Sequence, residues 1–144
     1  MNSPLCVDAG VVVRLLVDTP ESERVQGLWE AWQSADRTLV APTLLYYEVT
    51  HALYRYERAG ELIGEEVQQA LDTVLALPVQ LIGDNALHVE AVLLARRAGL
   101  PATYDAHYLA LAERLGAEFW TADRKLVRHL GAALPWVRCA LDMP

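Results

Sequence analysis

Apolar residues recur along the chain in two alternating patterns. Some apolar runs are too short for a helix, and they predict buried strands at 5–7, 38–41, 79–82, the run that contains Phe119 and Trp120, and 136–139. In the longer stretches, apolar residues keep the i, i+3, i+4, i+7 spacing of one buried helical face. These stretches predict helices at 11–17, 20–35, 42–60, 64–77, 84–99, 105–115 and 124–130.

Strands that alternate with helices throughout a chain are typical of an α/β fold, in which helices cover both faces of a mainly parallel sheet. The chain has 144 residues and shows no repeat, linker or low-complexity segment, so we expect a single domain over 1–144. No apolar run approaches the roughly 20 residues of a membrane span. We also expect no secretory signal, because no basic segment precedes an apolar one near the first residue.

Two carboxylates flank the fourth predicted strand. Asp105 begins the helix before that strand, and Asp123 lies between the strand and the next helix. Aspartate is among the best helix N-caps, so capping is the simpler interpretation of either residue alone. A functional site becomes the better interpretation only if other acids converge on the same place.

Other acids can reach the same edge of the predicted sheet. Parallel α/β sheets bind ligands beyond the carboxyl ends of their strands, and Asp8, like Asp123, follows a strand. Glu48 borders an otherwise apolar helical face, where a carboxylate is costly to bury unless it is paired or bound to metal. The structural alternative for Glu48 is an ion pair with an arginine, for which Arg14 is a candidate.

Asp84 also follows a strand and begins a helix, but its neighbours Gly83 and Asn85 suggest simple turn and cap chemistry. Periodicity alone does not separate Asp84 from Asp8, so the pattern gives a set of acids and not a final selection. Acids that converge repel one another, which raises their affinity for protons. Mg²⁺ relieves such repulsion, and it binds through one or two carboxylates together with waters and phosphate oxygens.

Charge and cysteine usage exclude several classes of function. The net charge of −7 argues against sequence-independent binding of nucleic acid over a broad basic surface, but not against nucleic acid held through metal ions. Cys6 and Cys139 are the only cysteines and form no CxxC motif, so we expect no zinc site and predict buried thiols in a reducing cytoplasm. No serine lies in a nucleophile-elbow context, which disfavours acyl transfer.

Other side chains give weaker signals. The histidines fall on different predicted helices without HxxxH spacing, and we expect them to be isolated: His51, His88, His107 and His129. A small basic group beside Asp123 is either a solvated helix face or a phosphate contact: Arg124, Lys125 and Arg128. Trp29 and Trp32 keep helical spacing, which favours the core over a partner surface.

Several of these motifs together resemble one known family. They are Val7-Asp8, Pro42-Thr43-Leu44 with Glu48, Tyr104-Asp105-Ala106 with Leu109-Ala110-Leu111-Ala112, and Thr121-Ala122-Asp123-Arg124. Over nearly the whole chain the sequence resembles a PIN domain, and in size and order a VapC-type toxin ribonuclease. The resemblance implies a five-stranded parallel sheet flanked by helices. It also implies an acidic site of Asp8, Glu48, Asp105 and Asp123 that is both catalytic and ligates Mg²⁺ or Mn²⁺, and it leaves Asp84 out.

The resemblance further implies a function. It points to a metal-dependent endoribonuclease that cleaves RNA by metal-activated water, to a small antitoxin encoded beside it, and to a cytoplasmic homodimer without a membrane segment. Trp29 and Trp32 then become candidates for a partner groove. Many relatives carry serine or threonine where this chain has Gly10, and a small hydroxyl residue where it has His107. Either change could alter the support of metal-bound water.

Two other functions are compatible with an α/β fold. One is a PIN-like module that binds RNA or protein without cutting it, which the departures at Gly10 and His107 leave open. The other is a phospho-acceptor receiver domain, which needs paired acids after the first strand and a lysine at a late strand end. Ala9 and Gly10 follow Asp8, and Lys125 falls inside a predicted helix, so this second function is disfavoured.

Overall fold

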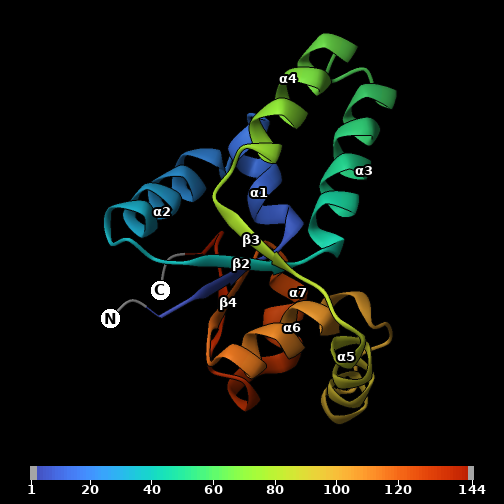
Figure 1. The fold of residues 1–144 in the computed structure, drawn as a ribbon. Helices are drawn as coiled ribbons and strands as arrows, with labels where there is room; N and C mark the ends of the chain where they lie inside the picture. Colours follow the sequence, from blue (N-terminus) through green and yellow to red (C-terminus); the bar gives the residue numbers. More distant parts are fainter. Residues whose placement is uncertain (1–2, 143–144) are drawn as a thin grey trace.

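A parallel sheet of five strands in the order β3-β2-β1-β4-β5 runs through the centre of the molecule (Figure 1). The computed structural model describes residues 3–142. The strands are β1 (Leu5–Val7), β2 (Leu39–Pro42), β3 (Val79–Ile82), β4 (Glu118–Thr121) and β5 (Val137–Cys139). The central strand β1 pairs with a neighbour on each side, so that Cys6 lies opposite Val40 of β2 and Phe119 of β4. The predicted α/β class and the five-stranded parallel sheet are confirmed.

Helices cover both faces of this sheet. They are α1 (Ala9–Leu16), α2 (Ser22–Ser34), α3 (Leu44–Arg58), α4 (Gly64–Leu75), α5 (Asn85–Ala98), α6 (Tyr104–Leu115) and α7 (Arg124–Leu130), which the 3₁₀ turn Gly131–Ala133 follows. Figure 1 shows α1 to α4 on one side of the sheet and α5 to α7 on the other. This division follows from right-handed crossovers, because the chain moves from β1 outward to β3 and then returns to β4 and β5.

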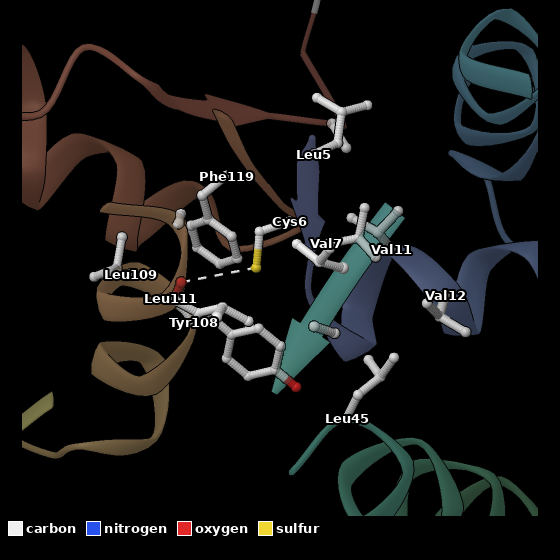
Figure 2. Close-up of a cluster of buried hydrophobic side chains, with 14 of the residues drawn as sticks. Leu5, Cys6, Val7, Val11, Val12, Leu45, Tyr108, Leu109, Leu111 and Phe119 are labelled. Carbon is white, nitrogen blue, oxygen red and sulfur yellow. Dashed lines mark hydrogen bonds between the residues drawn. The ribbon is translucent and has the colours of Figure 1, made fainter. Parts of the chain in front are cut away.

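The core forms where α6 packs on the central strands. Figure 2 shows Tyr108 and Phe119 beside Cys6; the two rings stack with their centroids 5.8 Å apart. The Cys6 thiol donates to the Tyr108 carbonyl oxygen at a sulfur–oxygen distance of 3.7 Å. Burial raises the pKa of this thiol well above its usual value, which makes Cys6 an inert core residue.

Two details of the sequence-based prediction change. Pro42 ends β2, and α3 begins at Leu44, because the fixed φ of proline suits the end of an extended strand.

Trp29 and Trp32 are buried, and the ring of Trp32 meets Trp120 edge-on with centroids 5.4 Å apart. Their assignment to the core is confirmed, and their assignment to a partner groove is wrong, since the core already covers both rings.

No helix within residues 3–142 is long and apolar enough to cross a membrane.

Candidate active site

Asp8 lies where the central strand ends, and the protein holds its carboxylate from several sides. As the N-cap of α1 it accepts a hydrogen bond from the backbone N–H of Val11 at 3.0 Å. It also accepts from the Thr121 hydroxyl and, at 3.4 Å, from the backbone N–H of Ala122. Desolvation nevertheless raises the pKa of Asp8 to about 6 against these hydrogen bonds, and the charge of Asp105 adds to the rise. The hydrogen bonds therefore fix the position of the Asp8 carboxylate, while burial and the charge of Asp105 destabilise its ionised form.

Asp105 is the second residue of α6, and Thr103 occupies the N-cap position. Within residues 3–142 its carboxylate accepts no hydrogen bond and forms no ion pair, so the capping interpretation is wrong for this residue. Desolvation raises its pKa, and the charges of Asp123 and Glu48 raise it further. These effects place Asp105 among the other acids of the predicted set.

Asp123 caps α7 by accepting from the backbone N–H of Leu126 at 3.1 Å, so capping is confirmed here. Its own backbone N–H donates to the Thr121 hydroxyl oxygen at 3.0 Å, while that hydroxyl donates to Asp8. Among the described residues, Thr121 is the one buried polar residue outside the aliphatic, aromatic and cysteine core. It links the backbone of one acid to the carboxylate of another. The prediction omitted this role, for which the only signal was a hydroxyl residue at the end of an apolar strand.

Glu48 on α3 accepts a hydrogen bond of 2.6 Å from the Tyr108 hydroxyl. Burial, and then this bond and the charge of Glu48, raise the pKa of Tyr108, so its hydroxyl stays a donor. Arg14 instead donates to the carbonyl oxygen of Gly10 at 3.0 Å and lies 4.0 Å from the carboxylate of Glu21. The alternative of an ion pair between Glu48 and Arg14 is wrong.

Three of the predicted acids line one open depression of about 570 Å³: Asp8, Asp105 and Asp123. Glu48 is not among its lining residues, but it acts on the charge of Asp105. Asp84 lies elsewhere, as the N-cap of α5. Arg114 binds both Asp84 oxygens, at 2.7 and 3.0 Å, and this pairing lowers the pKa of Asp84 to about 2. The structure thus separates Asp84 from the other acids, which the sequence pattern alone could not do.

The donors in this depression suit a hard divalent cation. Within residues 3–142 no three acidic, histidine or cysteine side chains stand close enough to form a ready-made metal cage. Mg²⁺ does not require one, because it keeps several waters and binds through one or two carboxylates together with phosphate oxygens. Carboxylates with pKa values raised by burial and by one another gain most from a nearby cation. The site fits Mg²⁺ better than a closed zinc centre.

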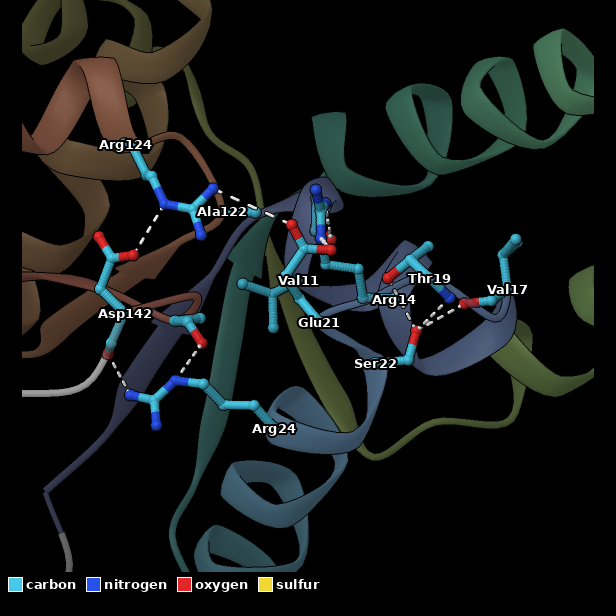
Figure 3. Close-up of polar contacts among 12 residues, drawn as sticks. Val11, Arg14, Val17, Thr19, Glu21, Ser22, Arg24, Ala122, Arg124 and Asp142 are labelled. Carbon is cyan, nitrogen blue, oxygen red and sulfur yellow. Dashed lines mark hydrogen bonds and ion pairs between the residues drawn. The ribbon is translucent and has the colours of Figure 1, made fainter.

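Basic side chains line the same depression: Arg14, Arg124, Lys125 and Arg128. Figure 3 shows Arg124 donating to Asp142 at 2.7 Å, with Glu21 3.9 Å from its guanidinium. Lys125 and Arg128 form no ion pair in the part of the chain that the structure describes. The depression therefore combines acids with two cationic side chains that are available for phosphate.

The two departures from the family pattern have different structural causes. A Cβ at Gly10 would lie 2.7 Å from the Cβ of Ala122, so the start of α1 and the turn after β4 touch there. His107 donates from Nδ1 to the carbonyl oxygen of Thr103 at 2.6 Å, and its Nε2 lies 2.9 Å from Nδ1 of His88. The prediction that the histidines are isolated is wrong, because the packing of α5 on α6 brings these two together.

Comparisons with known proteins agree with this architecture. The PIN domain model matches residues 5–130. Ribonuclease VapC3 of Pyrobaculum aerophilum is 32% identical over 130 residues, which are 89% of this chain and 95% of that protein.

Two solved structures share the fold at lower identity. The crystal structure of PAE2754 from Pyrobaculum aerophilum has a TM-score of 0.71 at 24% identity and covers 97% of this chain and 92% of that one. A chain of a toxin-antitoxin complex from Klebsiella pneumoniae has a TM-score of 0.67 at 20% identity, with 98% and 100% covered. On the match of the family model and the identity to Ribonuclease VapC3, the chain belongs to the PIN domain family, in its VapC-type group.

Proposed function

We propose that this chain is a divalent-metal-dependent endoribonuclease and the toxin of a toxin–antitoxin pair. The observation that carries the proposal is the meeting of Asp8, Asp105 and Asp123 in one depression, with Glu48 close enough to raise the pKa of Asp105. The names of the similar proteins support it, since one is Ribonuclease VapC3 and another is part of a toxin-antitoxin complex.

Asp8, Glu48, Asp105 and Asp123 are the residues that we assign to catalysis and to the binding of Mg²⁺, with Mn²⁺ as a substitute. When bound, the ion would neutralise these acids, activate a water and stabilise charge on the attacked phosphate. The protein contributes orientation. Asp8 is held by Val11, Thr121 and Ala122, and the Tyr108 hydroxyl fixes one oxygen of Glu48.

The basic side chains of the depression have a complementary role. Lys125 and Arg128 line it together with Asp105 and Asp123, so they can contact the phosphates of a bound RNA strand on either side of the cleaved bond. Phosphate contacts position a nucleic acid without reading its sequence. The net charge of −7 is consistent with such local binding, because the cations are gathered where the strand must lie.

The partners follow from the same proposal. We expect inhibition by a small antitoxin encoded beside this chain, a homodimer, and a cytoplasmic location. The buried pair of Trp29 and Trp32 does not provide the antitoxin surface.

The decisive experiment is incubation of the pure protein with a panel of structured RNAs in Mg²⁺, Mn²⁺ or EDTA. We expect cleavage with either ion and none in EDTA, and a strong loss in Asp105→Asn with a much smaller loss in Asp84→Asn. Equal cleavage in EDTA would contradict the proposal. RNA binding without cleavage under every condition would instead favour the non-cutting PIN-like module, for which the departures at Gly10 and His107 are the supporting observation.

The ends of the products test the chemistry. Water that attacks in line, with the 3′ oxygen leaving, gives a 5′-phosphate and a 3′-hydroxyl, and a single 2′-deoxy substitution at the scissile nucleotide is still cut. The contact between His88 and His107 makes the alternative worth testing, because histidines can drive the RNA 2′-hydroxyl onto the phosphate. Cyclic phosphate ends that form in EDTA and disappear in His88→Ala would replace the acidic mechanism with that one.

A further inference from the structure

A second cavity, of about 470 Å³, lies beside the acidic depression, and we call it the tyrosine pocket. Its side chains come from the beginnings of three helices: Thr43 and Tyr47 of the α3 region, His88 of α5, and Tyr104 and His107 of α6. Its volume falls within the range of roughly 300–1,000 Å³ that is typical of small-ligand sites. The proposed phosphodiester hydrolysis does not use this pocket.

The sheet order places the pocket next to the acids. The pocket lies at the carboxyl ends of β3 and β2, where Gly83 and Thr43 line it, and the acidic depression lies at the ends of β1 and β4. Figure 1 shows β2 leading into α3 and β3 leading into α5. Because β2 and β1 are neighbours, the two sites adjoin along one edge. The chain itself links them at the start of α6, since Tyr104 lines the pocket and the next residue, Asp105, lines the depression.

The two tyrosines are unusually exposed for their size. Tyr47 is 75% exposed and Tyr104 is 64% exposed, whereas Tyr108, one turn further along α6, is 1% exposed. Within residues 3–142 neither ring packs against another aromatic ring. Single-stranded RNA is recognised largely through unstacked bases that lie on such rings and form hydrogen bonds through their edges.

The histidines give the pocket directional polar groups. The carbonyl oxygen of Thr103 can only accept, so His107 carries its proton on Nδ1. With both rings neutral, Nε2 of His107 accepts from Nδ1–H of His88, and Nε2 of His88 is then an acceptor; with one ring protonated, Nε2 of His88 is a donor. Asn85 also lines the pocket, and its side chain has no hydrogen-bond partner among the described residues. Aromatic faces beside an imidazole nitrogen and a free amide match the polar edge of a nucleobase better than an apolar protein segment.

We propose that the tyrosine pocket holds an unstacked base of the RNA strand, from a nucleotide that flanks the cleaved phosphodiester bond. This inference rests on the proposed ribonuclease function and adds the subsite that reads the substrate. Tyr47 and Tyr104 supply the stacking surface, and His88 and Asn85 contact the edge of the base.

The test combines protein variants with RNA that lacks one base. After the cleavage site has been mapped on an RNA from the panel, an abasic nucleotide is placed in turn at each flanking position, and kcat/KM is measured. We expect Tyr47→Ala and Tyr104→Ala each to lower kcat/KM on intact RNA about tenfold or more, with Tyr47→Phe close to wild type. At one flanking position the abasic RNA should show a similar loss, and Tyr47→Ala should then add no further loss.

Tyr54→Ala is the matched control. Tyr54 lies two turns along the same helix, is 52% exposed and does not line the pocket, so its removal should leave kcat/KM unchanged. Independent, multiplicative losses from Tyr47→Ala and from every abasic position would overturn the base pocket while leaving the ribonuclease intact. A change in oligomeric state of Tyr47→Ala in analytical ultracentrifugation would also overturn it, by making the pocket a protein–protein surface.

A binding measurement separates the two proposals if no RNA is cleaved. Fluorescein-labelled oligouridylate and oligoadenylate of eight nucleotides are titrated with each variant in EDTA, with anisotropy as the readout. Weaker binding by about tenfold in Tyr47→Ala but not in Tyr54→Ala would support the pocket even though the proposed hydrolysis had failed. Equal binding by all variants, or no binding by the wild type, would overturn the pocket.

Discussion

Asp8 and Asp84 begin from the same local pattern and end in opposite environments. Each follows a parallel strand, and each caps the next helix through the backbone N–H three residues on. Asp8 lies at the end of the central strand, where burial and Asp105 raise its pKa to about 6. Asp84 lies at the end of the edge strand β3, where Arg114 lowers its pKa to about 2. For these two acids the surroundings that the fold supplies, and not the local sequence, decide whether the carboxylate joins a site or a surface ion pair.

The largest contrast should appear in activity. Asp8→Asn should lower kcat/KM for RNA cleavage by at least about 100-fold, because a lost metal ligand costs more than the roughly 10- to 100-fold of an outer partner. Asp84→Asn keeps the cap and lies outside the acidic depression. Asp84 lines the tyrosine pocket, but Arg114 holds both of its carboxylate oxygens, so we expect a much smaller loss, of less than about tenfold. If both variants remain folded by circular dichroism and lose similar activity, Asp8 has no special role in catalysis and the distinction from Asp84 is wrong.

The second contrast is in the pH dependence of stability, and its sign differs between the two acids. Native metal-free protein holds the Asp8 proton more tightly than the unfolded chain does, so between about pH 4 and pH 6 the free energy of unfolding falls as pH rises. The fall is of order 3 kcal/mol for a pKa raised from 3.8 to about 6. Asp84 has a lowered pKa, so its contribution is present above about pH 4 and is lost as pH falls toward 2.

Urea melts from pH 3 to pH 7 in EDTA measure both effects. Asp8→Asn should reduce the fall between pH 4 and pH 6 and leave the part that comes from Asp105. Asp84→Asn should reduce only the loss at the acid end, to which Asp142 also contributes. A wild-type profile that rises steadily through pH 6 would contradict the raised pKa of Asp8.

The third contrast is in the response to metal. A cation that binds only the native state stabilises it by about 2.7 kcal/mol at 100 times its Kd. The melting temperature should therefore rise with Mn²⁺ or Mg²⁺, less in Asp8→Asn and Asp105→Asn, and fully in Asp84→Asn. An equal rise in all three variants, measured by calorimetry, would show that the ion binds elsewhere.

The smallest effect concerns Glu48. Because Glu48 accepts from Tyr108 and forms no ion pair with Arg14, Glu48→Gln keeps an acceptor and leaves no arginine unpaired. The metal-free protein should lose less than about 1.5 kcal/mol of stability, the net value of one hydrogen bond, while activity falls. Denaturant melts in EDTA measure this, with Tyr108→Phe as the control for the same bond. A loss of several kcal/mol would indicate a structural role and remove Glu48 from the site.

The sequence predicts those features that depend on local periodicity. Alternating patterns gave the strands and helices to within a few residues, and the burial of Trp32 followed from its helical spacing. Periodicity could not predict contacts between segments that lie far apart in the sequence. His88 and His107 meet only because α5 packs on α6, and Thr121 reaches Asp8 only because β4 pairs with β1.

The acids illustrate the same limit. Their placement after strands could be read from the chain, yet Asp84 was separated from Asp8 only through the family resemblance. The physical difference is the partner, since Arg114 comes from a helix thirty positions away. The raised pKa of Asp105 likewise depends on Asp123 and Glu48, which reach it through the fold and not through local sequence.

The contact between Gly10 and Ala122 restricts the order in which these two positions can change during evolution. A side chain at position 10 would bring its Cβ within 2.7 Å of the Ala122 Cβ, so a hydroxyl residue there is sterically blocked while alanine occupies position 122. Ala122→Gly removes the obstacle and keeps the backbone N–H that donates to Asp8. A lineage could then acquire serine at position 10, whereas the reverse order passes through a strained intermediate. The two positions form an epistatic pair, in which the turn must change before the helix.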